Sequence, residues 1–359
     1  MERDTVEVYE QQAGDWKERR SRGRISEARR FASAVASGAP RIDLGCGPGF
    51  HVPYLGKPLV AIDAARAMLD LTRAESPSAW LVQADLEALP FRDRSFGGAW
   101  ARASYLHVPR TRLPLALARL HWAMRPGAPL ALFVRLGNGE GVALSEDGDF
   151  PGRFLAEWQA GPLADVLVGA GFTVDDMTED RGHTAEFLVA RARRGRTLPD
   201  TVGPGMRLLV CGLNPSVYAA DYGVGYARPN NRFWSMALAT ALVTRDRDPL
   251  HALTEHGIGM TDLVKRATHG ATDLTTGEYR EGVARVQRLV GWLEPGAVCF
   301  VGLAGWRAAL NPKAKPGVQP GGFAGVPAYV MPSTSGANAR TTMGELVKHL
   351  RAADALARG

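Results

Sequence analysis

Residues 207–216, RLLVCGLNPS, decide the fold of the C-terminal half of the chain. The apolar run at 208–211 is typical of a strand that is buried on both faces of a parallel sheet. The Asn214-Pro215 pair that follows forces a tight turn and presents the amide side chain at the edge of the sheet. The N-terminal half begins in a similar way, because PRIDLGCG at 40–47 runs from a short buried strand into a glycine turn.

Strand and helix patterns alternate on both sides of these two segments, which predicts parallel sheets with helices on both faces. The expected strands of the first half are 40–47, 59–63, 80–85, 96–101 and 129–136, with helices at 66–75 and 112–127. A helix and two strands over 164–193 should add an antiparallel edge. The expected strands of the second half are 206–216, 297–303 and 328–333, with helices at 231–242, 280–295 and 342–357.

The stretch RARRGRTLPDTVGPG at 191–205 separates the two alternations and has the proline and glycine content of a linker. A chain of 359 residues also exceeds the usual size of one domain. We therefore expect an α/β protein of two doubly wound domains, 1–194 and 195–359. Ligands of such sheets bind at the carboxyl ends of the strands, where the strand order reverses.

The positive charge of the chain lies almost entirely in its second half. Residues 197–359 contain 17 Lys or Arg against 12 Asp or Glu, whereas residues 1–196 contain 26 against 25. A basic excess of this kind is compatible with a polyanionic partner such as DNA.

Several classes of protein are disfavoured by composition. Cys46, Cys211 and Cys299 form no CxxC pair, so we expect three buried thiols and no cysteine-bound metal. The polar start lacks the apolar centre of a signal peptide, and no apolar run approaches the ~18 residues of a membrane span. The expectation is a cytoplasmic protein with no membrane partner and no metal.

Acidic and glycine residues recur at successive strand ends of the first half. DLGCGPG at 43–49 ends the first strand, and its glycines let the backbone turn and approach a ligand closely. Asp63 ends the second strand, placed to accept hydrogen bonds from ribose hydroxyls. Asp85 ends the third strand, close enough to bind an adenine amino group.

This order of motifs, with LPFRDRSFGG at 89–98 and RPG at 125–127, resembles the class I S-adenosylmethionine-dependent methyltransferases over roughly residues 8–191. The resemblance implies a Rossmann-like fold and S-adenosylmethionine as cofactor. It assigns cofactor contacts to Asp43, Gly45, Gly47, Asp63, Ala64, Asp85 and Leu86. The chain departs from the family at Gly97 and at His121, and no NPPY-like motif follows the fourth strand, which argues against a DNA base methyltransferase. A domain that keeps only the fold is the alternative.

The amide of Asn214 suggests a hydrolytic site in the second half. A carboxamide can orient a water molecule but is a poor base, so it suits a reaction in which the leaving group departs early. Cleavage of the glycosidic bond to a pyrimidine fits this description. Tyr226 offers a ring on which an extruded base could stack, and small residues around Ser216 and Ala219 leave room for the carbonyl edges of the base.

The motif from GLNP at 212–215 through ARPNNRFW at 227–234, together with VMPSTS at 330–335, resembles the uracil-DNA glycosylase superfamily and its mismatch-specific uracil/thymine group. The resemblance covers about residues 197–356 and implies an α/β/α sandwich that acts on mismatched or damaged pyrimidines in double-stranded DNA. The resemblance implies that Asn214 positions the hydrolytic water. It also implies contacts with the base or the DNA from Leu213, Ser216, Ala219, Tyr226, Asn231, Ser333, Ser335, Gly336, Ala337, Asn338 and Arg340.

Three departures accompany this second resemblance. Ala337 stands at the wedge position where relatives often have Leu or Arg, so we expect weaker assistance of base flipping unless Arg340 compensates. Ser216 replaces the usual glycine after Asn-Pro, which should tighten the pocket. The aspartate-bearing motif of highly active uracil enzymes is absent, which suggests slow turnover. In the NRFW segment, Phe233 and Trp234 are expected to pack in the core.

The leading hypothesis is excision of mispaired uracil or thymine, with G·U and G·T as substrates, by an enzyme that carries a second, methyltransferase-like domain. One alternative makes the methyltransferase the main activity and the C-terminal domain a module that tethers it to DNA. Another is a protein that binds DNA lesions with negligible turnover.

Overall fold

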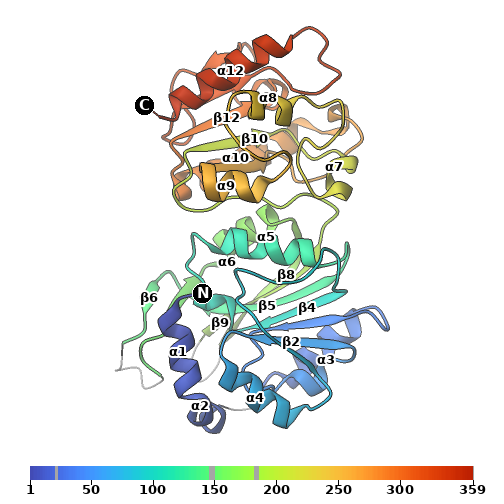
Figure 1. Ribbon diagram of the computed structural model, residues 1–359, viewed down its shortest axis with the longest axis vertical. Helices are drawn as coiled ribbons and strands as arrows, with labels where there is room; N and C mark the ends of the chain where they lie inside the picture. The colour runs from blue at the N-terminus through green and yellow to red at the C-terminus, as the bar shows by residue number, and fades with distance from the viewer. Residues whose placement is uncertain (21–22, 145–149, 182–185, 359) are drawn as a thin grey trace. The chain divides into compact units, whose positions relative to one another are not determined.

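The computed structural model describes residues 1–20, 23–144, 150–181 and 186–358, and the chain forms two compact units (Figure 1). The first unit comprises residues 1–168 and 172–195. The second comprises residues 169–171 and 196–359, so the chain passes from one to the other between Gly195 and Arg196.

The first unit is built on a parallel sheet with the strand order β3-β2-β1-β4-β5. The bounds are Arg41–Leu44 for β1, Leu59–Asp63 for β2, Trp80–Gln83 for β3, Gly98–Arg102 for β4 and Pro129–Leu136 for β5. The order reverses at β1, whose neighbours are β2 on one side and β4 on the other. The glycine turn after β1 therefore lies where a doubly wound sheet binds its ligand.

An antiparallel edge completes this sheet, as the sequence predicted. β9 (Glu186–Arg194) pairs antiparallel with β5 and with β8 (Phe172–Arg181). Within the segment 164–193, residues 182–185 lie outside the described residues. A further hairpin joins β6 (Glu140–Val142) to β7 (Phe154–Trp158), and β7 runs parallel to β5.

Helices accompany this sheet, and those expected at 66–75 and 112–127 are present. The helices are α1 (Arg3–Gln11), α2 (Ala13–Arg19), α3 (Ile25–Ala34), α4 (Arg66–Glu75), α5 (Leu113–Ala123) and α6 (Ala160–Gly169), with 3₁₀ turns at Val52–Tyr54 and Tyr105–His107. Trp100 of β4 is buried, and its ring contacts those of Phe31 and Phe133. These contacts link helix α3 to two central strands.

The second unit has its own sheet, in the order β11-β10-β12-β14-β13. β10 (Leu208–Gly212), β11 (Ile258–Asp262), β12 (Ala297–Val301) and β14 (Ala328–Met331) are parallel, and β13 (Gly317–Val318) is antiparallel to β14. β10, β12 and β14 were expected from the sequence. β11 was not, and it places a fourth parallel strand directly beside β10.

Six helices of the described chain accompany the second sheet: α7 (Val217–Tyr222), α8 (Phe233–Ala239), α9 (Pro249–His256), α10 (Thr276–Leu293), α11 (Ala304–Ala309) and α12 (Met343–Leu356), with a 3₁₀ turn at Ala271–Asp273. Capping boxes start α10 and α12, because Thr275 and Thr342 each exchange hydrogen bonds with a glutamate three residues later. Phe233 and Trp234 are fully buried in the core, which confirms their predicted packing role.

The three cysteines are buried free thiols, as expected. Within the described residues, no helix is both long and apolar enough to cross a bilayer.

Candidate functional sites

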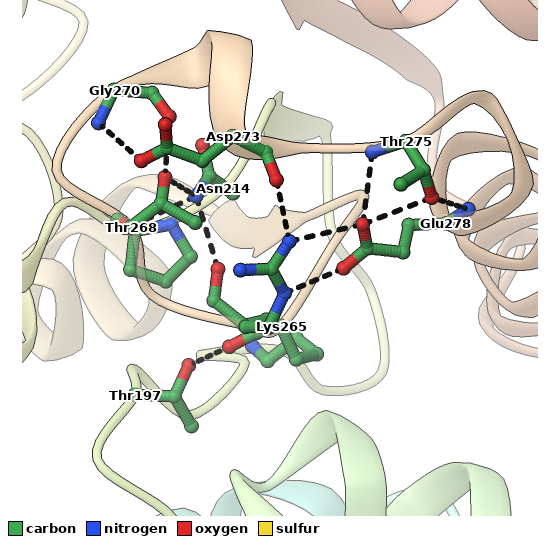
Figure 2. A network of polar contacts seen from close by, with 10 residues as sticks. Thr197, Asn214, Lys265, Thr268, Gly270, Asp273, Thr275 and Glu278 are labelled. Atoms are coloured by element: carbon green, nitrogen blue, oxygen red, sulfur yellow. Dashed lines mark hydrogen bonds and ion pairs between the residues drawn. The ribbon is translucent and has the colours of Figure 1, made fainter.

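Asn214 lies directly after β10, and its side-chain nitrogen is surrounded by acceptors. Nδ2 lies 3.1 Å from the carbonyl oxygen of Pro215, 3.0 Å from that of Arg266 and 2.8 Å from Oγ1 of Thr268 (Figure 2). Because carbonyl oxygens only accept hydrogen bonds, they fix which end of the amide is nitrogen. The orientation leaves Oδ1 with no hydrogen bond to any described residue, so this oxygen can accept one from a bound molecule.

Arg266 and Thr268, which accept hydrogen bonds from Asn214, are themselves held by other residues. Arg266 forms a two-point ion pair with Glu278 at the start of α10, at 2.6 and 3.0 Å, and also donates to the carbonyl oxygen of Asp273 (Figure 2). Thr268 donates to the carbonyl oxygen of Gly270. The guanidinium of Arg266 is therefore engaged with Glu278.

Asp262, at the end of β11, is a site residue that the sequence analysis missed. It pairs in register with Gly212, and a side chain on Gly212 would lie only 2.2 Å from Oδ1 of Asp262 and 2.9 Å from the Tyr226 hydroxyl. A glycine is therefore needed for this carboxyl and this phenol to approach the strand end. Burial raises the pKa of Asp262 to about 6, against the opposing effect of Lys265. The signal was available: like Asp63, Asp262 is an aspartate that ends a short, mainly apolar strand.

Tyr226 adopts a left-handed backbone conformation with φ of 58°. Its ring is stacked on that of Phe233, with 4.3 Å between centroids and an interplanar angle of 21°. The ring is half-buried, whereas the hydroxyl is fully buried without a hydrogen-bond partner in the described chain. Phe233 thus supports the ring from one face, which fixes the plane that Tyr226 offers on the other.

Ser216 and Ala219 are linked by a helix cap. The hydroxyl of Ser216 accepts a hydrogen bond of 3.1 Å from the Ala219 amide at the start of α7. Ala219 is buried, and its N–H is used by this cap rather than left free for the carbonyl edge of a base. Leu213 is half-buried, and its carbonyl oxygen accepts from the amide of Val264, which ties the turn after β10 to the residues after β11.

The predicted wedge position, Ala337, lies in a loop at 333–340 that follows β14. Ser335, Gly336, Ala337 and Arg340 are exposed, and Asn338 is half-buried, with its amide donating to the Ser333 carbonyl and to Thr341 Oγ1. The Ser333 hydroxyl accepts from the Ser335 amide.

Arg232 of the NRFW segment holds this loop. Its guanidinium donates to the carbonyl oxygens of Ser335, Asn338 and Thr341, at 3.3, 2.8 and 2.5 Å. The side-chain oxygen of Asn231 accepts a hydrogen bond of 3.0 Å from the amide of Phe233, the first residue of α8. Both polar residues of the motif therefore have hydrogen-bond partners within the domain. Arg228, Lys313 and Lys315 are exposed.

In the first unit, the carboxyls predicted to bind a cofactor are gathered at the β1–β2 edge. Asp43 is buried, and burial together with the neighbouring Asp63 raises its pKa to about 8. Asp63 accepts hydrogen bonds from the amides of Gly47 and Ala65, at 2.9 and 3.0 Å, and burial raises its pKa to about 6. Gly47 has φ of 54° and open space where a side chain would be, so a ligand can approach its backbone.

The remaining predicted cofactor residues follow β2 and β3. The carbonyl oxygen of Ala64 accepts from the Gln83 side chain, Leu86 is buried, and Asp85 accepts from the amide of Glu87 at 2.8 Å. His107, after β4, is buried between the Phe154 carbonyl and the Tyr9 hydroxyl, each 2.7 Å from a ring nitrogen. Because a carbonyl accepts only, Nδ1 carries the proton and Nε2 accepts from Tyr9.

Comparison with known families gives one match in each unit. Residues 42–132 match the model of a methyltransferase domain, and residues 199–355 match the model of the uracil DNA glycosylase superfamily. The chain carries a methyltransferase domain and a uracil DNA glycosylase superfamily domain. The glycosylase-family match includes Asn214, Asp262 and the loop at 333–340, and the methyltransferase match includes Asp43, Asp63 and Asp85.

Among solved structures, the similar ones include methyltransferases of low sequence identity. An S-adenosylmethionine-dependent methyltransferase from Methanosarcina mazei is 17% identical, with a TM-score of 0.41, over 45% of this chain and 95% of that chain. The 1,6-didemethyltoxoflavin-N1-methyltransferase of Burkholderia thailandensis is 21% identical, with a TM-score of 0.42, over 54% and 86%. A Mesorhizobium loti methyltransferase is 20% identical, with a TM-score of 0.40, over 48% and 99%.

The described residues contain no group of three or more His, Cys, Asp or Glu side chains that could hold a metal ion.

Proposed function

We propose that the C-terminal domain is a DNA glycosylase that hydrolyses the N-glycosidic bond of mispaired uracil or thymine in double-stranded DNA. The observation that carries the proposal is the arrangement of Asn214, whose amide nitrogen is held by three acceptors while its oxygen is left for a ligand. A fixed acceptor of this kind can position a water molecule without being a strong base.

The chemistry follows from that arrangement. The C1′–N1 bond breaks first, and its electron pair leaves with the base, so the sugar gains oxocarbenium character. A water molecule held by Asn214 Oδ1 then adds its oxygen to C1′, and the proton it loses ends on the released base. The amide only has to orient the water, because the electron-poor sugar carbon needs no strong nucleophile.

The surroundings of Asn214 suit an extruded pyrimidine. Tyr226, supported by Phe233, supplies a ring for stacking, and Leu213 and Ser216 flank Asn214 in the same turn. The exposed loop that includes Ser335, Gly336, Ala337 and Arg340, with Ser333 and Asn338 at its base, would contact the DNA backbone and fill the space that the base leaves. Asn231 and Ala219 act by shaping α8 and α7.

We propose further that the methyltransferase domain binds S-adenosylmethionine. The residues fit this cofactor, because the open backbone face at Gly47 adjoins the carboxyl of Asp63, which accepts a hydrogen bond from the Gly47 amide. Asp63 and Ala64 would hold the ribose, Gly45 and Gly47 would border the methionine part, and Asp85 and Leu86 would bind the adenine. The cofactor would supply an activated methyl group, and the chain's own residues would bind and orient it.

The decisive experiment is a nicking assay. Duplexes that contain a single G·U or G·T mismatch are incubated with the full chain and treated with alkali, which breaks the strand at an abasic site. We expect strand breaks with the native protein and a loss of at least about 100-fold in the Asn214→Ala variant. Equal breakage by both proteins, or none by either, would contradict the proposal.

Calorimetry with S-adenosylhomocysteine tests the other domain separately. Binding by the native chain is expected, and no heat at millimolar ligand would rule out the cofactor assignment. The Asn214→Ala variant is the control, because it should bind this ligand as the native chain does.

A further inference from the structure

The side-chain carboxyl of Asp262 has no role in the glycosylase mechanism proposed above. It lies at the end of β11, in register with Gly212 and therefore directly beside the turn that carries Asn214. The amides of Leu263 and Val264 donate to the carbonyl oxygens of Gly212 and Leu213, at 3.0 and 2.9 Å, so this strand end cannot move independently of that turn. Its carboxyl makes no hydrogen bond or ion pair with any described residue, although Lys265 and Arg285 are nearby.

The two nearby cations are held by another group. Lys265 and Arg285 both pair with Asp200, at 2.8 and 2.7 Å, and Arg285 also donates to Thr261 Oγ1 and to the backbone carbonyl of Asp262. The backbone of Asp262 is thus fixed from behind while its carboxyl stays unpaired. The carboxyl is half-buried, and the unpaired Tyr226 hydroxyl lies on the same side of Gly212.

From this placement we infer that Asp262 is the specificity-determining residue that reads the hydrogen-bonding edge of the extruded base. The inference rests on the proposed glycosylase function and deepens it. An ionised carboxylate only accepts hydrogen bonds, so it pairs with the N3–H of uracil or thymine. Cytosine has a lone pair at N3, and a carboxylate beside it would be repelled. The residue therefore selects bases that carry an imide N–H.

The ionisation state of Asp262 should therefore change the preference for uracil or thymine over cytosine. The charged and titratable groups that face it are Lys265, Asp200 and Arg285, with Cys211 on β10 and Tyr226. Burial places the pKa of its carboxyl at about 6. When protonated, the carboxyl can donate to N3 of cytosine and accept from its amino group, so discrimination should weaken as the pH falls through this value.

The test measures binding of the base, independently of cleavage. The target nucleotide is 2′-fluoro-deoxyuridine or 2′-fluoro-deoxycytidine, which resist hydrolysis, placed opposite an abasic analogue so that neither is paired. The readout is the ratio of the cytosine to the uracil dissociation constant. For the native chain we expect a ratio of about ten or more at pH 8, and a fall toward one at pH 5.

The Asp262→Asn variant should lose both the preference for uracil and its dependence on pH. The reason is that an amide can turn either a donor or an acceptor toward the base. We expect a ratio within about threefold of one at pH 8, with no pH dependence. Asp246→Asn, which removes an exposed carboxylate of the same domain, is the matched control and should behave as the native chain.

The native chain alone already tests the inference if the variant does not fold. A ratio near one at pH 8, or a high ratio that does not change down to pH 5, would overturn it, as would an Asp262→Asn variant that discriminates like the native chain. Such results would leave the Asn214-dependent release of uracil untouched. Conversely, a chain that never releases uracil refutes the proposed function itself.

Discussion

The guanidinium of Arg232 and the carbonyl oxygen of Asn338 lie 2.8 Å apart, although 106 positions separate them in the chain. The same side chain also holds the carbonyls of Ser335 and Thr341. A charged donor shared by three backbone acceptors fixes the shape of the exposed loop at 333–340. Arg232, at the start of α8, thereby couples the motif after β10 to the motif after β14.

Replacing Arg232 by Met should loosen this loop while keeping most of the apolar stem. We expect a stability loss of about 1–3 kcal/mol from the lost hydrogen bonds. Uracil release from duplex DNA should fall about tenfold or more, with a much smaller effect on single-stranded DNA, where no base has to be flipped. Chemical denaturation and parallel cleavage assays measure both effects. Arg351→Met, an exposed change on α12, serves as the control, and equal losses on both kinds of DNA would refute the loop assignment.

Thr268→Val keeps the shape of the side chain but removes the hydroxyl that accepts from Asn214 at 2.8 Å. The amide would keep its other two acceptors, so we expect a partial loss of uracil release, about three- to tenfold, with little change in the affinity for DNA. Single-turnover cleavage and a binding titration separate these quantities. The exposed Thr254→Val on α9 should change neither. A Thr268→Val variant with native cleavage would show that this hydrogen bond is not needed to orient Asn214.

Asp200 should stabilise the glycosylase domain in a pH-dependent way. Burial alone would raise the pKa of its carboxyl, but Arg285 and Lys265 reverse this and lower the pKa below its usual value. A lowered folded-state pKa means that the stabilisation is complete above the unfolded value, roughly pH 4, and is lost as the pH falls through the folded value. Asp200→Asn leaves two buried cations without their anion and should lower the free energy of unfolding by about 3–5 kcal/mol at pH 7.

Thermal and denaturant unfolding of both proteins between pH 7 and pH 3 checks this prediction. The difference in stability between native and Asp200→Asn chains should shrink toward the acid end. A constant difference over the whole range would contradict the ionised state of Asp200.

Asp63→Ala should weaken binding of S-adenosylhomocysteine about tenfold or more. The carboxyl holds the amide of Gly47 at 2.9 Å, so its loss would both remove a ribose acceptor and release the glycine turn. Calorimetry gives the affinity directly. Asp70→Ala, on the exposed side of α4, should bind like the native chain, and a normal affinity in Asp63→Ala would place the ligand elsewhere.

Much of this protein could be predicted from local sequence. Leu208–Gly212 is a short apolar run before an Asn-Pro turn, and Arg41–Leu44 is a short buried strand before a glycine turn. Such patterns indicate both the strands and the edge at which they end. The spacing of the motifs after β10 and β14 indicated the glycosylase family, and the acidic residues after β1, β2 and β3 indicated the methyltransferase. Each motif is a run of residues that are close together in the chain, and the order of the motifs can be read from the sequence without the fold.

Only the tertiary structure brought Asp262 beside Gly212, because β11 is a short strand with a glycine inside it and its pairing with β10 spans about fifty residues. The same holds for Arg232 and its loop, and for the three acceptors around Asn214, two of which come from residues 266 and 268. Local sequence determines where a strand begins and ends. Which side chains then meet across strand ends depends on the order of strands in the folded sheet, and that order is set by packing of the whole domain.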